Sequence, residues 1–200
     1  MAICHYLTHP EVNIDPKVAT PRWGLSDIGR HRLQTAINRG IFNQTEVIVA
    51  SSEQKAIDAT SMISSHLDKE FVIDPNCDEN DRTSTGFLSH VEFEQVADLF
   101  FERPNQSVRG WETADLAQRR IIAAVQRHVE NWDERQILFV GHGAVGTLLK
   151  CYIGQRKISR DEDQRRMAAK GGGNIFAFDW AQQALHTDWV SMEDWAAQQQ

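Results

Sequence analysis

The segment ILFVGHG, residues 137–143, decides the fold of this chain. Its first four residues form the short, continuously apolar pattern of a buried strand, and His142 follows after a single glycine. A second run of this kind, AICHYLT at residues 2–8, leads directly into His9. The carboxyl ends of strands in an open α/β sheet form its ligand crevice. We therefore expect His9 and His142 to meet at one edge of the sheet.

Strand and helix patterns alternate along the rest of the chain. Ser26 has the position of a helix cap, and Gly40 has the position at which that helix ends. The pattern predicts helices over residues 26–39, 53–67, 90–101 and 114–129, and strands over residues 2–7, 46–50, 70–73, 136–140, 174–180 and 185–190. The last two strands, after the triple glycine 171–173, indicate a hairpin at the sheet edge.

These elements predict an α/β protein with a three-layer sandwich. A mostly parallel central sheet is flanked by helices and carries an antiparallel edge strand. The length of 200 residues is ordinary for one globular unit, so we expect a single domain over residues 1–200.

Composition narrows the class of partner. The formal net charge of -7 argues against nonspecific binding to nucleic acid or to an anionic membrane, and favours a small-molecule partner. The cysteines, Cys4, Cys77 and Cys151, form no CxxC pair, which is typical of a reducing compartment. No apolar run approaches the ~20 residues that span a bilayer, and the start of the chain has no basic segment ahead of an apolar one. We expect a cytoplasmic protein, and the sequence implies no oligomeric state.

Several short segments follow one another in the order and approximate spacing of a known set of motifs. They are Thr8-His9-Pro10-Glu11, residues 23–30, Ser51-Ser52-Glu53-Gln54-Lys55-Ala56, Glu79 ahead of Gly86, Gly110-Trp111-Glu112-Thr113, and Val140-Gly141-His142-Gly143. Together they resemble the histidine phosphatase superfamily, also called phosphoglycerate mutase-like. In that family an Arg-His-Gly motif follows the first strand, and a second histidine follows a late strand. The resemblance covers most of the chain and implies the phosphoglycerate mutase-like fold.

The resemblance assigns a role to each of three residues. His9 would attack phosphorus and carry the phosphoryl group, and Pro10 favours the extended backbone that aims it at a crevice. His142, at the start of a helix, would stabilise the negative charge on the phosphate oxygens. Glu79 would protonate the leaving oxygen and then help to activate water, although a solvated acid in an acidic loop is the alternative for this residue. The scheme needs no metal and no cofactor.

Two departures from the family pattern bear on phosphate binding. Thr8 and Lys55 stand where the family has arginines, and neither offers the rigid two-donor fork of a guanidinium. Each lost charged hydrogen bond costs about 1.5–3 kcal/mol, or roughly tenfold to a hundredfold in affinity or rate. Arg82 is a candidate to compensate, as are Arg22 and Arg30. We take Thr8, Lys55 and Arg82 as the substrate-binding residues.

The sequence thus predicts a slow phosphomonoesterase, a histidine-type acid phosphatase that acts on a small phosphorylated substrate through a phosphohistidine. A mutase is disfavoured because it must shield the intermediate from water, and the short middle segment indicates no such lid. The first alternative is a catalytically degenerate relative that binds a ligand or a protein. The second is a dinucleotide enzyme, because residues 141–146 fit G-x-G-x-x-G, but no strand with a terminal acid follows at the required distance.

Overall fold

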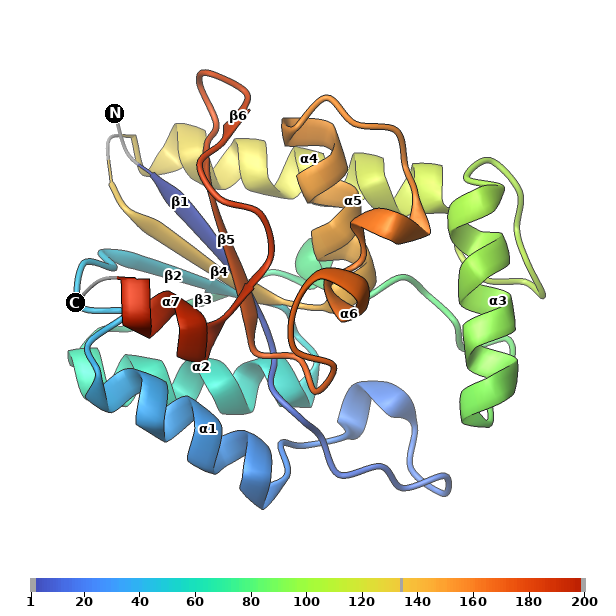
Figure 1. Cartoon of the computed structure of the whole chain (residues 1–200), viewed down its shortest axis with the longest axis horizontal. Coiled ribbons are helices and arrows are strands. Elements are labelled where there is room, and N and C mark those ends of the chain that lie inside the picture. The colour runs from blue at the N-terminus through green and yellow to red at the C-terminus, as the bar shows by residue number, and fades with distance from the viewer. Residues whose placement is uncertain (1–2, 134, 199–200) are drawn as a thin grey trace.

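A computed structural model describes residues 3–133 and 135–198 of the chain. Within them, a seven-stranded sheet has the order β3-β2-β4-β1-β5-β6, and β7 also pairs with β5. Strands β3, β2, β4 and β1 are parallel to one another, whereas β5 is antiparallel to β1, β6 and β7 (Figure 1). The strands are β1 (Cys4–Thr8), β2 (Val47–Ala50), β3 (Val72–Ile73), β4 (Ile137–Gly141), β5 (Asn174–Asp179), β6 (Ala184–Leu185) and β7 (Val190–Ser191).

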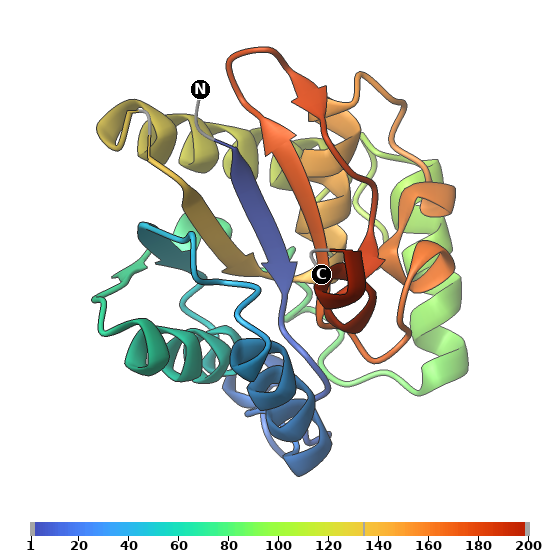
Figure 2. The same cartoon turned by 60° about the vertical axis from the view of Figure 1, so that its left-hand side comes forward.

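Helices cover both faces of this sheet (Figures 1 and 2). Helices α1, α2 and α7 pack on one face, and α4 and α5 pack on the other. A separate apolar cluster joins α3 to α4 and α5. The helices are α1 (Asp27–Asn38), α2 (Gln54–Leu67), α3 (His90–Glu102), α4 (Ala114–Asn131), α5 (Gly143–Ile153), α6 (Gln164–Met167) and α7 (Met192–Gln198). The predicted three-layer α/β fold with an antiparallel edge is confirmed.

None of the described helices is long and apolar enough to cross a membrane.

Strand β4 lies between β2 and β1, and all five of its residues are buried. Leu138 and Val140 face the α1 and α2 layer, whereas Ile137 and Phe139 face α4. Burial on both faces explains why this strand is a continuous apolar run and not an alternating one.

The carboxyl-terminal edge differs in detail from the sequence prediction. Instead of one strand over residues 185–190, two short strands, β6 and β7, pair with β5. Between them, the backbone N–H groups of His186 and Thr187 both converge on the carbonyl of Ala177, at 2.8 and 3.3 Å. This convergence interrupts the regular ladder. Asp188 then reaches an ion pair with the buried Lys150 of α5.

The glycines of the G-x-G-x-x-G pattern lie against the side chains of Tyr6 and Gln164, where a larger residue would not fit. A Cβ atom built on Gly141 would lie 2.3 Å from the Tyr6 hydroxyl, and one on Gly146 would lie 2.4 Å from the Tyr6 ring. A Cβ atom on Gly143 would lie 2.3 Å from Nε2 of Gln164. Close packing on Tyr6 of β1 accounts for Gly141 and Gly146, and close packing on Gln164 of α6 accounts for Gly143, with no dinucleotide required.

We predict that Gly146→Ala destabilises the protein. The new methyl group collides with Tyr6 and lies 3.1 Å from Trp189, and overpacking of this kind costs about 1–3 kcal/mol. The preference of alanine for helices, about 1 kcal/mol, offsets only part of that cost. Urea unfolding should give a lower free energy of unfolding for the variant. Ser65→Ala, at an exposed position of α2, should stay within about 0.5 kcal/mol of the wild type. A Gly146→Ala protein as stable as the wild type would contradict this packing.

Candidate active site

The parallel pairing of β1 with β4 brings the two histidines together. Thr8 lies opposite Gly141 in the register, and the backbone N–H of His9 donates to the carbonyl of Gly141 at 2.9 Å. The ring centroids of His9 and His142 are 5.2 Å apart. Two imidazoles that are far apart in the sequence thus share the carboxyl edge of the sheet.

The backbone beside His9 fixes its tautomer. Nδ1 lies 2.8 Å from the carbonyl oxygen of Pro10, and a carbonyl only accepts hydrogen bonds, so Nδ1 carries the proton. The lone pair of the ring is then on Nε2. Burial, together with the charges of Lys55 and Arg82, lowers the pKa of His9 to about 4. His9 is therefore neutral near pH 7, with Nε2 available as a nucleophile.

His142 is held through Nε2, whereas His9 is held through Nδ1. Its Nε2 lies 2.6 Å from the hydroxyl oxygen of Ser51, whose proton goes to the carboxylate of Asp78 at 2.8 Å. Since that proton is used, Nε2 of His142 must donate to Ser51. Nδ1 has no partner among the described residues. Burial lowers the pKa of His142 well below its ordinary value, so the ring gains a proton only when a bound anion compensates the charge.

Glu79 does not lie in open solvent. Its carboxylate accepts the backbone N–H groups of Ala144 at 3.3 Å and Val145 at 3.1 Å, in the first turn of α5. Burial raises the pKa of this carboxyl above its ordinary value, although Arg82 opposes the rise. The helix N-terminus that follows His142 is thus already occupied by a carboxyl group of the protein.

Lys55 is only 2% exposed and is engaged on two sides. Its ammonium forms an ion pair with Glu53 and donates to the carbonyl of Thr20 at 2.9 Å. The second oxygen of Glu53 accepts the backbone N–H of Glu79 at 3.1 Å and lies 3.8 Å from Nε2 of His142. Burial alone would raise the pKa of Glu53, but His142, Lys55 and Arg82 lower it to about 2. Glu53 is therefore a carboxylate.

Thr8 uses its hydroxyl within the protein. It donates to Oε1 of Gln164 at 2.7 Å and accepts the backbone N–H of Asn174 at 3.0 Å. The side-chain amide of Asn174 bonds both backbone groups of Ala169, which fixes its orientation, and its nitrogen then donates to Oε1 of Gln164 at 2.7 Å. Oε1 of Gln164 thus accepts two hydrogen bonds, whereas Nε2 of the same side chain has no partner among the described residues.

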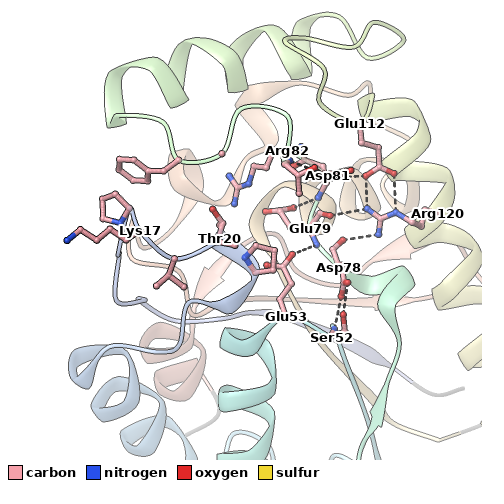
Figure 3. Close-up of a pocket in the computed structure, with 18 residues that line it drawn as sticks. Lys17, Thr20, Ser52, Glu53, Asp78, Glu79, Asp81, Arg82, Glu112 and Arg120 are labelled. Carbon is pink, nitrogen blue, oxygen red and sulfur yellow. Dashed lines mark hydrogen bonds and ion pairs between the residues drawn. The ribbon is translucent and has the colours of Figure 1, made fainter.

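Arg82 offers a guanidinium with no ion pair among the described residues. Its charged group lies 5.2 Å from the ring centroid of Phe93 and 6.0 Å from that of Trp111, so aromatic faces hold it. It lines three cavities, two of which also contain Glu79, and Figure 3 shows it across from Glu79 and Thr20.

The two cavities meet at Glu79 and Arg82. A cavity of about 270 Å³ is lined by His9, Gly143 and Gln164 as well as by these two residues. A larger one of about 540 Å³ extends past Glu53 toward the loop 16–21 and Phe87 (Figure 3). A group bound beside His9 would therefore lie next to a group bound in the larger cavity.

The structure gathers His9, His142 and Glu79, with Lys55 and Arg82 close enough to shift the pKa of His9. Thr8 is not free to bind a ligand with its hydroxyl hydrogen, because the hydroxyl donates a hydrogen bond to Gln164. The sequence analysis missed Gln164 and Glu53. For Glu53 a signal was present, because its carboxylate stands two positions before Lys55 in the motif 51–56. For Gln164 the polar stretch around it carries no such signal.

No group of three or more His, Cys, Asp or Glu side chains in residues 3–133 and 135–198 is arranged to hold a metal ion.

Comparison with known proteins identifies the family. The model of the histidine phosphatase superfamily (branch 1) matches residues 18–185, and the chain belongs to this superfamily. The resemblance seen in the motifs is thereby confirmed, although the matched residues begin after Thr8-His9-Pro10. A search of curated proteins gave no match.

Similar solved structures show the same fold. Mycobacterial glucosyl-3-phosphoglycerate phosphatase is 17% identical with a TM-score of 0.73, covering 95% of this chain and 99% of that one. Bacillus stearothermophilus YhfR is 16% identical with a TM-score of 0.74, covering 94% and 95%. Phosphoserine phosphatase from Entamoeba histolytica, in complex with 3-phosphoglyceric acid, is 13% identical with a TM-score of 0.71, covering 94% and 97%.

The tautomer and pKa of His9 can be measured by nitrogen NMR of the histidine rings. We predict that Nδ1 of His9 carries the proton at pH 7, and that the ring titrates near 4. The unfolded chain then binds more protons than the folded one between about pH 6.5 and 4. The free energy of unfolding is therefore higher above this pH window than below it, and the contribution of His9 is lost as the pH falls from 6.5 to 4.

A His9→Gln variant assigns the His9 signals, and its stability should fall less steeply between pH 6.5 and 5. A titration of His9 near 6.5, or a proton on Nε2 at pH 7, would contradict the geometry described.

Proposed function

We propose that this chain is a phosphomonoesterase that works through a phosphohistidine at His9. The observation that carries the proposal is the hydrogen bond from Nδ1 of His9 to the Pro10 carbonyl, which leaves the Nε2 lone pair free beside His142. Membership of the histidine phosphatase superfamily supports it, as do structural neighbours named as phosphatases.

In the first step, the lone pair on Nε2 of His9 attacks phosphorus, and the bond from phosphorus to the leaving oxygen breaks. Glu79 is the proposed acid, because its pKa is raised and it lines both cavities. It gives its proton to the leaving oxygen as that bond breaks. His142 takes up a proton as the anion arrives, and Nδ1 then donates to a phosphate oxygen.

In the second step, water attacks the phosphoryl group on His9. The Glu79 carboxylate takes a proton from the water, the bond from phosphorus to Nε2 breaks, and inorganic phosphate leaves. The scheme uses no metal and no cofactor. The leaving group would occupy the larger cavity.

The proposed location is the cytoplasm. All three cysteines are free and buried, which suits a reducing compartment.

Arg82, Gln164 and Lys55 are the proposed ligands of the phosphate. Within residues 3–133 and 135–198, Arg82 has no acidic partner and Nε2 of Gln164, beside the start of α5, has no hydrogen-bond acceptor. Thr8 contributes by orienting the amide of Gln164, so a hydroxyl and an amide together take the place of the arginine expected before His9. Lys55 reaches phosphate only after its pair with Glu53 opens.

We predict that the purified protein hydrolyses p-nitrophenyl phosphate between pH 5 and 8 without added metal, and that His9→Ala abolishes this activity. Loss of the nucleophile removes the covalent route altogether. His31→Ala, at an exposed position of α1, should retain the wild-type rate. Turnover that persists in His9→Ala would rule out His9 as the nucleophile.

A second candidate function is ligand binding without turnover. The ion pair of Lys55 with Glu53 favours it, because one of the two cations assigned to the phosphate is already neutralised. This alternative predicts that phosphorylated ligands bind the wild type and that neither the wild type nor His9→Ala hydrolyses them.

We predict that Arg82→Met raises the KM for the aryl phosphate about tenfold to a hundredfold, with a smaller effect on kcat. The variant removes one charged hydrogen bond to the phosphate, worth about 1.5–3 kcal/mol. Arg119→Met, an exposed arginine of α4, is the matched control and should leave the KM unchanged. An Arg82→Met enzyme with wild-type KM would exclude Arg82 from the phosphate site.

A further inference from the structure

The site already contains an anion of its own. Glu53 is 7% exposed, and its carboxylate lies between Lys55 and His142. One oxygen forms the ion pair with Lys55, and the other lies 3.8 Å from Nε2 of His142. The charge of Arg82 also acts on it. A single buried carboxylate thus interacts with three of the cationic or donor groups around His9.

Two backbone contacts keep Glu53 in this place. Its own N–H donates to the Ser51 hydroxyl at 3.1 Å, and its carboxylate accepts the backbone N–H of Glu79 at 3.1 Å. The Lys55 ammonium also holds the carbonyl of Thr20, so it remains anchored if Glu53 is removed. The lysine can therefore stay in the site while its counterion changes.

The Glu53 carboxylate makes Lys55 a weaker ligand for a phosphate dianion. One ammonium can hold two anions, as Lys150 does with Glu162 and Asp188, but like charges on one ammonium repel each other in a water-poor site. Phosphate must therefore either displace Glu53 from Lys55 or share Lys55 with it. In both cases Glu53 lowers the affinity of the site for a doubly charged phosphate.

We propose that Glu53 is a specificity-determining residue that competes with the phosphoryl group for Lys55 and so limits binding of dianionic phosphate. This inference rests on the proposed function, because it takes the space beside His9 as the phosphate site. It goes further by naming the residue that sets the affinity. The charge of Glu53, and not only the lost arginines, weakens phosphate binding.

The test is the affinity for inorganic phosphate at pH 7.5, measured by isothermal titration calorimetry. Glu53→Gln keeps the size of the side chain and an oxygen for the Glu79 N–H, but removes the charge. We expect its Kd for phosphate to fall about tenfold to a hundredfold below that of the wild type. Phosphate should also raise the melting temperature of this variant more than that of the wild type, because it replaces the lost partner of Lys55.

Two further variants separate this effect from general charge. Glu112→Gln removes a carboxylate that lines the same cavity but pairs with Arg120, and it should leave the Kd unchanged (Figure 3). In the double variant Glu53→Gln with Lys55→Met, the gain in phosphate affinity should disappear, since the gain requires a free lysine. If Glu53→Gln does not fold, Glu53→Asp withdraws the carboxylate from Lys55 and should lower the Kd at least about threefold.

Unchanged or weaker phosphate binding in Glu53→Gln, an equal gain in Glu112→Gln, or a gain that survives Lys55→Met would each overturn the inference. So would the absence of phosphate binding in all variants. These outcomes are independent of turnover. The proposed function fails instead if hydrolysis is absent from the wild type or persists in His9→Ala.

Discussion

The parallel pairing of β1 with β4 is the constraint on which the rest of the site depends. Because Thr8 lies opposite Gly141, the chain leaves both strands at the same edge, and His9 and His142 follow them there. Burial of β4 on both faces makes this register costly to change. The close packing of α5 on Tyr6, which only glycine allows, then sets where the helix after His142 begins.

The electrostatics of the site follow from its burial. Both imidazoles are kept neutral, so His9 is a ready nucleophile, but neither ring attracts an anion before one arrives. Carboxyl groups of the protein already occupy two positions that favour an anion, since Glu53 pairs with Lys55 and Glu79 accepts hydrogen bonds from the start of α5. Arg82 remains as the cation without an acidic partner among the described residues. A site of this kind binds phosphate less strongly than one with several free arginines.

The sequence predicted the layers and most of the elements, because apolar periodicity records burial directly. It did not separate β6 from β7, since the backbone N–H groups of His186 and Thr187 that converge on the Ala177 carbonyl interrupt the ladder there, and no side-chain pattern marks such a convergence. The two histidines and Glu79 were found through strand ends and motif order. The partners of Thr8 and Lys55 were not, because apolar periodicity does not record hydrogen bonds between polar side chains, whether the partner is near, as Glu53 is to Lys55, or distant. Gln164 reaches Thr8 across 156 positions.

The central claim is that Nε2 of His9 receives the phosphoryl group. The direct measurement is mass spectrometry of peptides from enzyme quenched in base during turnover of p-nitrophenyl phosphate, with the phosphohistidine isomers distinguished by phosphorus NMR. The account predicts one modified residue, His9, phosphorylated on Nε2, because the Pro10 carbonyl holds Nδ1. Phosphate on Nδ1 or on another side chain, or hydrolysis with no phosphorylated enzyme at any time, would contradict it.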